Sequence, residues 1–158
     1  MKLHTLVALL ALPALPAFAG VIACPDLAAA KQVAACPSEE ELKYTFTGFC
    51  SDDRRMYGTD TDACTDYALY RKLKNKALWE SADGNFSAYV SCDRTPESVK
   101  SAKARSVTVS KQKKLSLLVC GYGDELRFTH RTHAECKLDP GAAAACAADP
   151  AACKASCE

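Results

Sequence analysis

The chain has 158 residues, 49% of them hydrophobic, and its 20 basic and 19 acidic side chains leave a formal net charge of +1. Without an N-terminal export signal, this length still suffices for one ordinary domain with its own hydrophobic core. The nearly neutral charge argues against a protein that attacks membranes, because such proteins combine strong positive charge with a large amphipathic face.

Residues 1–19 have the pattern of a secretory signal peptide. A short basic start is followed by an apolar stretch, Thr5–Phe18, and by a small-x-small cleavage site at Ala17–Ala19. This stretch is shorter than the roughly 20 apolar residues that a membrane span requires. Val21–Cys24 also loosely matches a bacterial lipoprotein box, although cysteine richness is atypical of lipoproteins. We therefore expect a secreted protein without a membrane span, folded as one domain over residues 20–158.

All ten cysteines follow the predicted cleavage site. They are Cys24, Cys36, Cys50, Cys64, Cys92, Cys120, Cys136, Cys146, Cys153 and Cys157. An even number of cysteines in an exported chain predicts five disulfides, in preference to a catalytic or metal-binding set. Each disulfide is expected to stabilise the fold by about 2–5 kcal/mol.

The N-terminal segment of the domain, residues 20–40, is predicted to be helical. Pro25–Ala35 is alanine-rich, and proline suits the first turn of a helix. Such a helix would hold Cys24 and Cys36 about 17 Å apart, whereas a disulfide needs Cα atoms within about 7 Å. These two cysteines are therefore expected to pair with other cysteines.

Residues 41–136 are predicted to form an α+β core, in which one main helix packs on an antiparallel sheet. The alternating, aromatic-rich segment Leu42–Cys50 predicts a strand, and the polar segment Ser51–Asp62 predicts a loop. Ala63–Glu80 is predicted as the main helix, and Phe86–Cys92 as a second strand. The apolar stripe of this helix would comprise Cys64, Tyr67, Ala68, Leu73, Ala77 and Leu78.

A short helix and an antiparallel meander are predicted to follow. Thr95 suits a helix cap and Pro96 a first helical position, in a helix that extends to about Ala102. Ala104–His133 contains three alternating runs separated by two polar or glycine-bearing breaks, which is typical of a meander with one buried face. The side chains expected on that face are Val107, Val109, Leu115, Leu117, Val119, Leu126, Phe128 and His130.

The C-terminal tail, residues 137–158, is rich in alanine and is predicted to be helical, but it contains few large apolar side chains. Its cysteines are therefore expected to hold it in place. Because the N-terminal segment is equally poor in large apolar groups, we expect at least one disulfide between the two.

Basic residues are concentrated between Ser98 and Gly123, where no acidic residue occurs. The candidate contacts for an anionic partner are Lys100, Lys103, Arg105, Lys111, Lys113 and Lys114. Lysines also suit a polar hairpin turn and protect edge strands, and no aromatic residue in the run is placed to stack on bases. Nucleic acid is therefore not the favoured partner.

One modification site is predicted. Asn85-Phe86-Ser87 is an N-glycosylation sequon. It follows Asp83-Gly84, a turn signal, so the asparagine is expected to be exposed. In a eukaryotic host we expect a glycan on Asn85.

A helix followed by a meander resembles the layout of small microbial ribonucleases. In that family a strand glutamate, a histidine and a basic residue cleave RNA, and the corresponding candidates here are His130, Arg105 and Arg127. No glutamate lies within a strand between Phe86 and Leu118, so half of the acid–base pair is missing. His130, His133 and Cys136 have a spacing that suits zinc ligands, but residues three apart on a strand point to opposite faces. We therefore expect neither a metal nor another cofactor.

The signal peptide, the ten cysteines and the lack of a catalytic motif resemble the small secreted cysteine-rich proteins of filamentous fungi, many of which are plant-pathogen effectors. The resemblance implies a monomeric virulence factor that acts in the apoplast or inside host cells. There it would bind a host protein and suppress defence without catalysis. One form would be a protease inhibitor that uses a loop such as Asp52–Thr61. The alternatives are a ribonuclease-fold toxin that acts on RNA and a structural or antimicrobial secreted protein.

Overall fold

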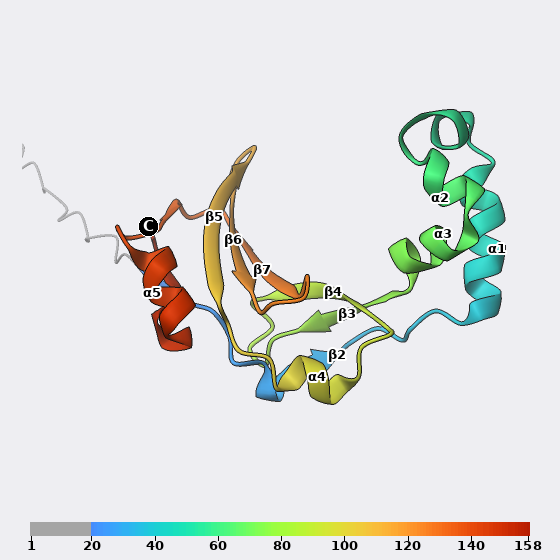
Figure 1. Cartoon of the computed structure of the whole chain (residues 1–158). Coiled ribbons are helices and arrows are strands. Elements are labelled where there is room, and N and C mark those ends of the chain that lie inside the picture. Colours follow the sequence, from blue (N-terminus) through green and yellow to red (C-terminus); the bar gives the residue numbers. More distant parts are fainter. Residues whose placement is uncertain (1–19) are drawn as a thin grey trace, which may run out of the picture.

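The fold consists of a β-rich body and a helical arm that stands to one side of it (Figure 1). The computed structural model describes residues 20–158, so the predicted signal peptide lies outside the described residues. The predicted α+β class is confirmed, and all ten cysteines form disulfides. Among residues 20–158, none of the helices combines the length and the apolar character that a bilayer span requires.

The main sheet of the body has six antiparallel strands. In spatial order they are β2 (Lys31–Gln32), β3 (Lys76–Glu80), β4 (Ser87–Ser91), β7 (Arg127–Thr132), β6 (Leu115–Gly121) and β5 (Ser106–Gln112). Strands β5, β6 and β7 form the predicted meander, which is confirmed. The predicted second strand is also confirmed, as β4.

One face of this sheet is covered and the other is open. The turn η1 (Leu27–Ala29) and the helix α4 (Pro96–Lys100) lie beneath the sheet in Figure 1. Thr95 caps α4 by accepting a hydrogen bond from the backbone N–H of Ser98, so the predicted start of this short helix is confirmed. The fully buried side chains of the core include Leu27, Val99, Val107, Leu118, Cys120 and Phe128.

The predicted buried face is wrong on β6. Leu118 and Cys120 are buried there, together with Ser116, whereas Leu115, Leu117 and Val119 are only half-buried on the open face. The register pairs Val107 with Cys120 and Cys120 with Phe128, so a disulfide cysteine occupies the core position. Both faces of β6 are apolar, and the alternation of hydrophobic and polar residues therefore does not identify its inner side.

A second, three-stranded sheet joins the two ends of the described chain. Its strands, in the order β1-β9-β8, are β1 (Gly20–Ala23), β9 (Lys154–Cys157) and β8 (Cys136–Lys137). The tail before β9 contains α5 (Ala142–Ala148) and the turn η3 (Pro150–Ala152). The prediction of a disulfide between the N-terminal segment and the tail is wrong. Instead, backbone hydrogen bonds between β1 and β9 connect these two segments.

The five disulfides are Cys24–Cys120, Cys36–Cys92, Cys50–Cys64, Cys136–Cys157 and Cys146–Cys153. Cys24 and Cys36 do not pair with each other, as expected, but the helix that motivated this expectation is absent. Pro25–Ala35 contains only η1 and β2. This alanine-rich segment is too short to form a stable helix unless packing against the rest of the protein stabilises it.

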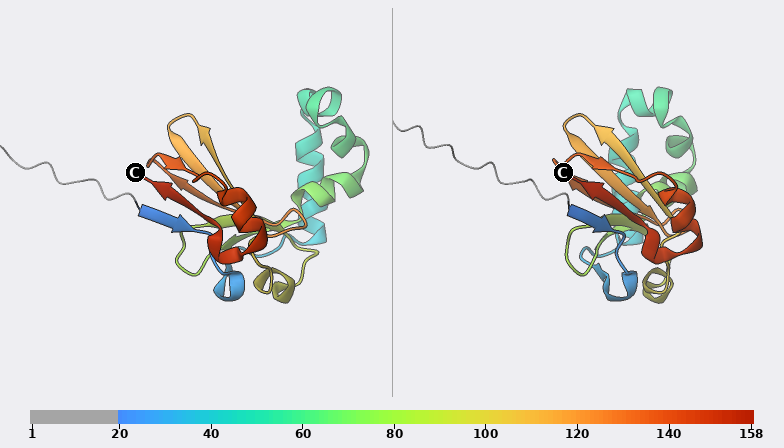
Figure 2. Two further views of the ribbon diagram at one scale, coloured as in Figure 1. Left: turned by 60° about the vertical axis from the view of Figure 1, so that its left-hand side comes forward. Right: turned by 90° about the vertical axis from the view of Figure 1, so that its left-hand side faces the viewer.

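The arm comprises residues 39–74. Its elements are α1 (Glu39–Cys50), the π-helical turn η2 (Arg55–Thr59), α2 (Thr61–Thr65) and α3 (Tyr67–Lys74). The three helices pack on one another, and the left view of Figure 2 shows them away from the sheet. Their small core consists of Leu42, Ala63 and Tyr70, with Phe46, Phe49 and Tyr67 packed against it.

Two sequence predictions in the arm are wrong. Leu42–Cys50 forms helix α1, because Leu42, Phe46 and Phe49 recur at helical spacing and Ser38 and Glu41 form a capping box at its start. The predicted helix Ala63–Glu80 divides into α2, α3 and β3. Asp66 is extended between α2 and α3 and caps α3, which interrupts the helix after Thr65.

Candidate functional site

The ribonuclease-like residues do not converge. His130 lies on the core side of β7, where its Nδ1 donates a hydrogen bond to the carbonyl oxygen of Asn85 at 2.8 Å. Its ring is 5.3 Å from that of Phe86. Arg127 is three residues earlier on the same strand and therefore points to the open face. Arg105 lies just before β5, with its side chain exposed.

The three residues whose spacing suits zinc ligands do not come together either. Cys136 is bonded to Cys157, and within residues 20–158 no group of three histidine, cysteine or acidic side chains is placed to hold a metal ion. His130 is already engaged with the loop that carries Asn85. The spacing His130-x-x-His133-x-x-Cys136 thus reflects a strand that leads into a disulfide.

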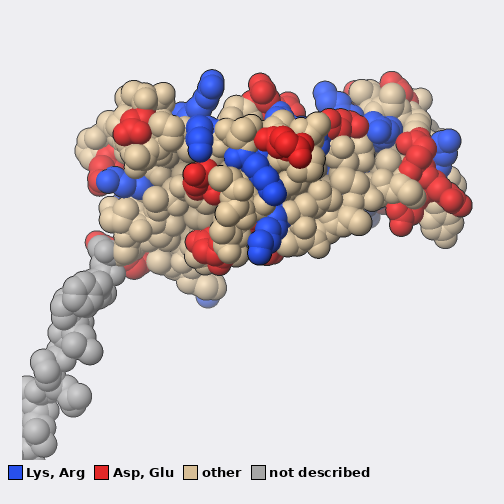
Figure 3. Space-filling view, turned by 90° about the horizontal axis from the view of Figure 1, so that it is seen from below, with Lys and Arg blue, Asp and Glu red and all other residues tan. Residues whose placement is uncertain are grey.

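The basic run does not form one continuous cationic surface. Lys103 lies 3.2 Å from Asp26, and Lys111 lies 2.7 Å from Glu135, so acids from distant segments neutralise both. The two-residue turn between β5 and β6 consists of Lys113 and Lys114, which are exposed. Basic and acidic side chains are interspersed over the face in Figure 3. Lys100 at the end of α4 and Arg105 just before β5 are both exposed.

Asn85 is exposed in the turn between β3 and β4. Its Nδ2 donates a hydrogen bond to Asp83 at 2.7 Å, and its backbone N–H donates to the same carboxylate at 3.1 Å. Hydrogen bonds from Ser81 and Asn85 lower the pKa of Asp83. Asn85 is therefore accessible for glycosylation, which remains a prediction.

One concave surface is a cleft between α3 and the open face of the sheet, which we call the sheet–helix cleft. Its volume is about 770 Å³. Leu69 and Leu73 of α3 form one wall, and Tyr89 of β4 stands on the floor with 74% of its surface exposed. The rim carries Lys72, Lys76, Arg94, Asp124 and Glu125. An apolar floor with a charged rim is typical of a surface that binds another molecule.

The sequence pattern placed Leu73 on the buried stripe of a long helix. In the structure Leu73 is 43% exposed, because α3 ends at Lys74 and only Tyr70 of this helix is fully buried. Leu69 and Leu73 are four residues apart and therefore neighbours on one helical face. This spacing was the available signal for the cleft. Neither Tyr89 nor Arg94 had a sequence signal.

The rim of the cleft opposite α3 is a strained turn between β6 and β7. Asp124 and Glu125 have φ angles of 45° and 63°, in the left-handed region that non-glycine residues rarely occupy. Arg94 holds this turn, since its guanidinium donates a hydrogen bond to the carbonyl oxygen of Asp124. The backbone N–H of Leu126 donates to Gly123 and closes the turn at 2.8 Å. The acidic rim is therefore fixed in place relative to β4.

A polar cluster attaches the arm to the body beside the cleft. Arg71 lies 3.3 Å from Glu39 of α1 and 3.2 Å from Asp93 of the body, and Asp93 also accepts a hydrogen bond from Asn75 at 3.1 Å. Asp93 raises the pKa of Arg71, chiefly through the hydrogen bond that the Arg71 guanidinium donates to it. The Tyr67 hydroxyl, followed by Arg71, lowers the pKa of Glu39. The orientation of the α3 wall thus depends on a few polar contacts and on the nearby disulfide Cys36–Cys92.

Comparison of the sequence with protein-family models and curated proteins, and of the structure with solved structures, gives no match. The sheet–helix cleft offers apolar contacts, a phenol, and charges of both signs. Such a set suits recognition of another protein surface.

Proposed function

We propose that the protein is a secreted effector that binds a host protein through the sheet–helix cleft and suppresses plant defence without catalysis. The observation that carries the proposal is the exposure of Leu69, Leu73 and Tyr89 around one concavity, on a fold that five disulfides brace. Exposed aliphatic and aromatic side chains inside a polar rim are the usual anchors of a protein interface. The disulfides also suit an oxidising extracellular environment.

The protease-inhibitor form of this proposal has less support than the cleft. Asp52–Thr61, the segment suggested as an inhibitory loop, contains the helical turn Arg55–Thr59 and is enclosed by Cys50–Cys64. A helical turn cannot add an extended strand to a protease cleft in the manner of β-strand addition. We therefore assign the contact with the host protein to the sheet–helix cleft.

The ribonuclease alternative is not favoured by a specific observation. His130 faces the core side and Arg127 the open side of the same strand. A general acid and a phosphate-binding group must reach the same substrate. Incubation of the purified protein with RNA remains the direct measurement, and cleavage that His130→Ala abolishes would replace the binding proposal.

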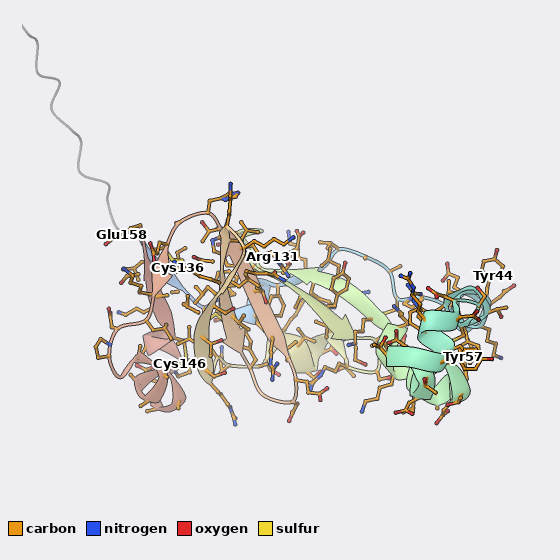
Figure 4. The ribbon with its side chains drawn as sticks, turned by 90° about the horizontal axis from the view of Figure 1, so that it is seen from above. Tyr44, Tyr57, Arg131, Cys136, Cys146 and Glu158 are labelled. Carbon is orange, nitrogen blue, oxygen red and sulfur yellow. A yellow bond between two sulfur atoms is a disulfide. The ribbon has the colours of Figure 1, made fainter. Side chains whose placement is uncertain are left out.

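The binding proposal is tested with two double variants, each of which replaces two exposed apolar or aromatic side chains by serine. One pair lies in the cleft and the other lies outside it. Leu73→Ser combined with Tyr89→Ser removes two apolar groups from the cleft. Tyr44→Ser combined with Tyr57→Ser removes two tyrosines, each 82% exposed, at the far end of the arm (Figure 4). The wild-type protein and both variants are immobilised and exposed to plant extract, and the retained proteins are quantified by mass spectrometry.

We expect a saturable partner that the wild type and the Tyr44/Tyr57 variant retain equally. The cleft variant should bind that partner at least about 30-fold more weakly, which corresponds to the loss of one interface hot spot. Equal retention by the cleft variant would exclude the cleft as the binding surface. The absence of any saturable partner in extracts of several plant tissues would count against the effector proposal as a whole.

A further inference from the structure

One disulfide, Cys36–Cys92, links the segment that leads into the arm to the body. Cys36 precedes α1 by three residues, and Cys92 directly follows β4. The apolar cluster of the arm is separate from the larger cluster of the body. The other four disulfides lie within the arm or within the body. Apart from the chain itself, Cys36–Cys92 is thus the covalent tie between the two parts.

This disulfide is also the most accessible of the five. Cys36 is exposed and Cys92 half-buried, whereas each other disulfide includes at least one buried cysteine. Cys120, Cys146 and Cys153, for example, are all 0% exposed. Thiol–disulfide exchange requires a thiolate to reach one sulfur, so access decides which bond reacts first.

Cys36 lies in the wall of a second concavity, which we call the hinge pocket. Its volume is about 760 Å³, and its walls include Phe49, Arg55, Lys74 and Lys76. Arg55 and Lys74 lie over the ring of Phe49, at 4.1 and 4.6 Å from its centroid. This places two cations within one pocket, and Lys76 adds a third.

The hinge pocket contains one acid, Glu41, which is engaged elsewhere. Its carboxylate accepts the backbone N–H of Ser38 at 2.7 Å in the capping box of α1. Glu41 keeps its negative charge there, and Asp52 lies 3.9 Å from Arg55, so the three cations exceed the two nearby acids by one charge and leave the hinge pocket weakly positive. A positive concavity raises the local concentration of an anion and its rate of encounter.

We propose that Cys36–Cys92 is a thiol-exchange site for a small anionic thiol of the glutathione class, which docks in the hinge pocket. The thiolate attacks Sγ of Cys36, forms a mixed disulfide there and releases Cys92 as a thiolate, which takes a proton from water. A second thiolate attacks the sulfur of the bound thiol, and Cys36 leaves and is protonated. Overall, two thiols are oxidised to one disulfide while Cys36–Cys92 is reduced to two thiols.

Exchange at this site releases the arm. The α3 wall of the sheet–helix cleft then depends on the two chain connections and on the polar contacts of Arg71 and Asn75 with Asp93. An anionic thiol therefore loosens the surface that binds the partner, a consequence that rests on the proposed function. The exchange reaction itself does not depend on any partner.

The chemistry is tested on the folded wild-type protein with three thiols of different charge. Glutathione is anionic, mercaptoethanol neutral and cysteamine cationic, and each is supplied at the same concentration of thiolate. Samples taken over time are alkylated and mapped by mass spectrometry. We expect Cys36 and Cys92 to be the first cysteines modified, with the glutathione adduct on Cys36 and with glutathione reacting fastest.

Charge variants distinguish docking of the thiol in the hinge pocket from a reaction that depends only on the exposure of Cys36–Cys92. Lys74→Gln combined with Lys76→Gln should slow the reaction with glutathione about tenfold and should not slow that with cysteamine. Lys113→Gln combined with Lys114→Gln removes the same charge from the β5–β6 turn and should leave both rates unchanged. Earlier opening of another disulfide, or equal slowing of both thiols in the hinge-pocket variant, would overturn the proposal.

Release of the arm is measured separately. Small-angle scattering should show a larger radius of gyration after exchange, and Cys36→Ser combined with Cys92→Ser should reproduce it without any thiol. If this double variant binds a captured partner as the wild type does, the regulatory consequence fails while the partner-binding proposal stands. If no partner exists, the order and charge dependence of the exchange still decide the chemical proposal.

Discussion

At the scale of single residues, Tyr122 connects the end of β6 to the N-terminal segment. Its hydroxyl donates a hydrogen bond to the carbonyl oxygen of Pro25 at 2.6 Å, and its ring meets that of Phe128 edge to face. Burial, together with the charge of Asp26, raises the pKa of Tyr122. The phenol therefore remains protonated and able to donate at neutral pH.

Tyr122→Phe removes this hydrogen bond and leaves the ring in place. We expect the free energy of unfolding to fall by about 1 kcal/mol, the usual net value of one hydrogen bond. Urea denaturation followed by fluorescence measures it. Tyr89→Phe is the matched control. Because Tyr89 is 74% exposed, loss of its hydroxyl should leave the free energy of unfolding unchanged. Equal stability of wild type and Tyr122→Phe would contradict this role.

A second residue-scale expectation concerns Glu39, whose pKa is lowered by the hydrogen bond from Tyr67 and then by Arg71. A lowered pKa in the folded state means that the stabilisation is present above the ordinary glutamate pKa of about 4.3 and is lost as the pH falls through the folded value. As the pH is lowered from about 5 to about 2, the melting temperature of Glu39→Gln should therefore fall less steeply than that of the wild type.

Calorimetry at a series of pH values measures this difference. Glu40→Gln is the control, because Glu40 is the neighbouring acid on the same helix and has no hydrogen-bond partner among the contacts of residues 20–158. An acid dependence identical in wild type and Glu39→Gln would mean that the Tyr67 and Arg71 contacts contribute nothing in solution. The expected effect is small because water surrounds Glu39.

At the scale of elements, local signals predicted α4 and the meander, because a cap, a proline and strict alternation are encoded within a few residues. Leu42–Cys50 was misassigned because its aromatic residues fit a strand by type and a helix by spacing. The capping box formed by Ser38 and Glu41 was the signal that favoured the helix. Ala77 and Trp79 alternate inward on β3, although the same segment also continued the helical pattern of α3.

The disulfides differ in how strongly they restrain these elements. Cys24–Cys120 spans 96 residues and Cys146–Cys153 spans 7. In the chain-entropy account the first should stabilise the fold by about 4.7 kcal/mol and the second by about 2.4 kcal/mol. We therefore expect Cys24→Ala combined with Cys120→Ala to lower the denaturation midpoint more than Cys146→Ala combined with Cys153→Ala.

Denaturant titration of the two double variants provides the comparison. Cys24 is half-buried and Cys120 fully buried, whereas Cys146 and Cys153 are both fully buried, so loss of packing alone would favour a larger effect of the second pair. A larger loss from the Cys146/Cys153 pair would show that this short disulfide acts by holding α5 against the body, and that loop length is not the deciding quantity.

At the scale of the whole molecule, the sequence predicted the number of disulfides but neither their pairing nor the division into body and arm. Cysteine counting is independent of the fold, whereas connectivity depends on which segments become neighbours. The cleft could not be predicted for the same reason. Leu73, Tyr89 and Asp124 meet only after α3, β4 and the β6–β7 turn have packed. The exposure of Leu73 further required that the main helix end at Lys74.

The pairing of Gly20 with Cys157 has a practical consequence for any attachment chemistry. Both ends of the described chain emerge at one pole of the molecule, and the arm occupies the opposite pole (Figures 1 and 4). A linker fused to either end and anchored to a bead or sensor chip would therefore present the arm outward, toward the solution. The same orientation would apply to a carrier protein fused at that pole, which would leave the concave surfaces unobstructed.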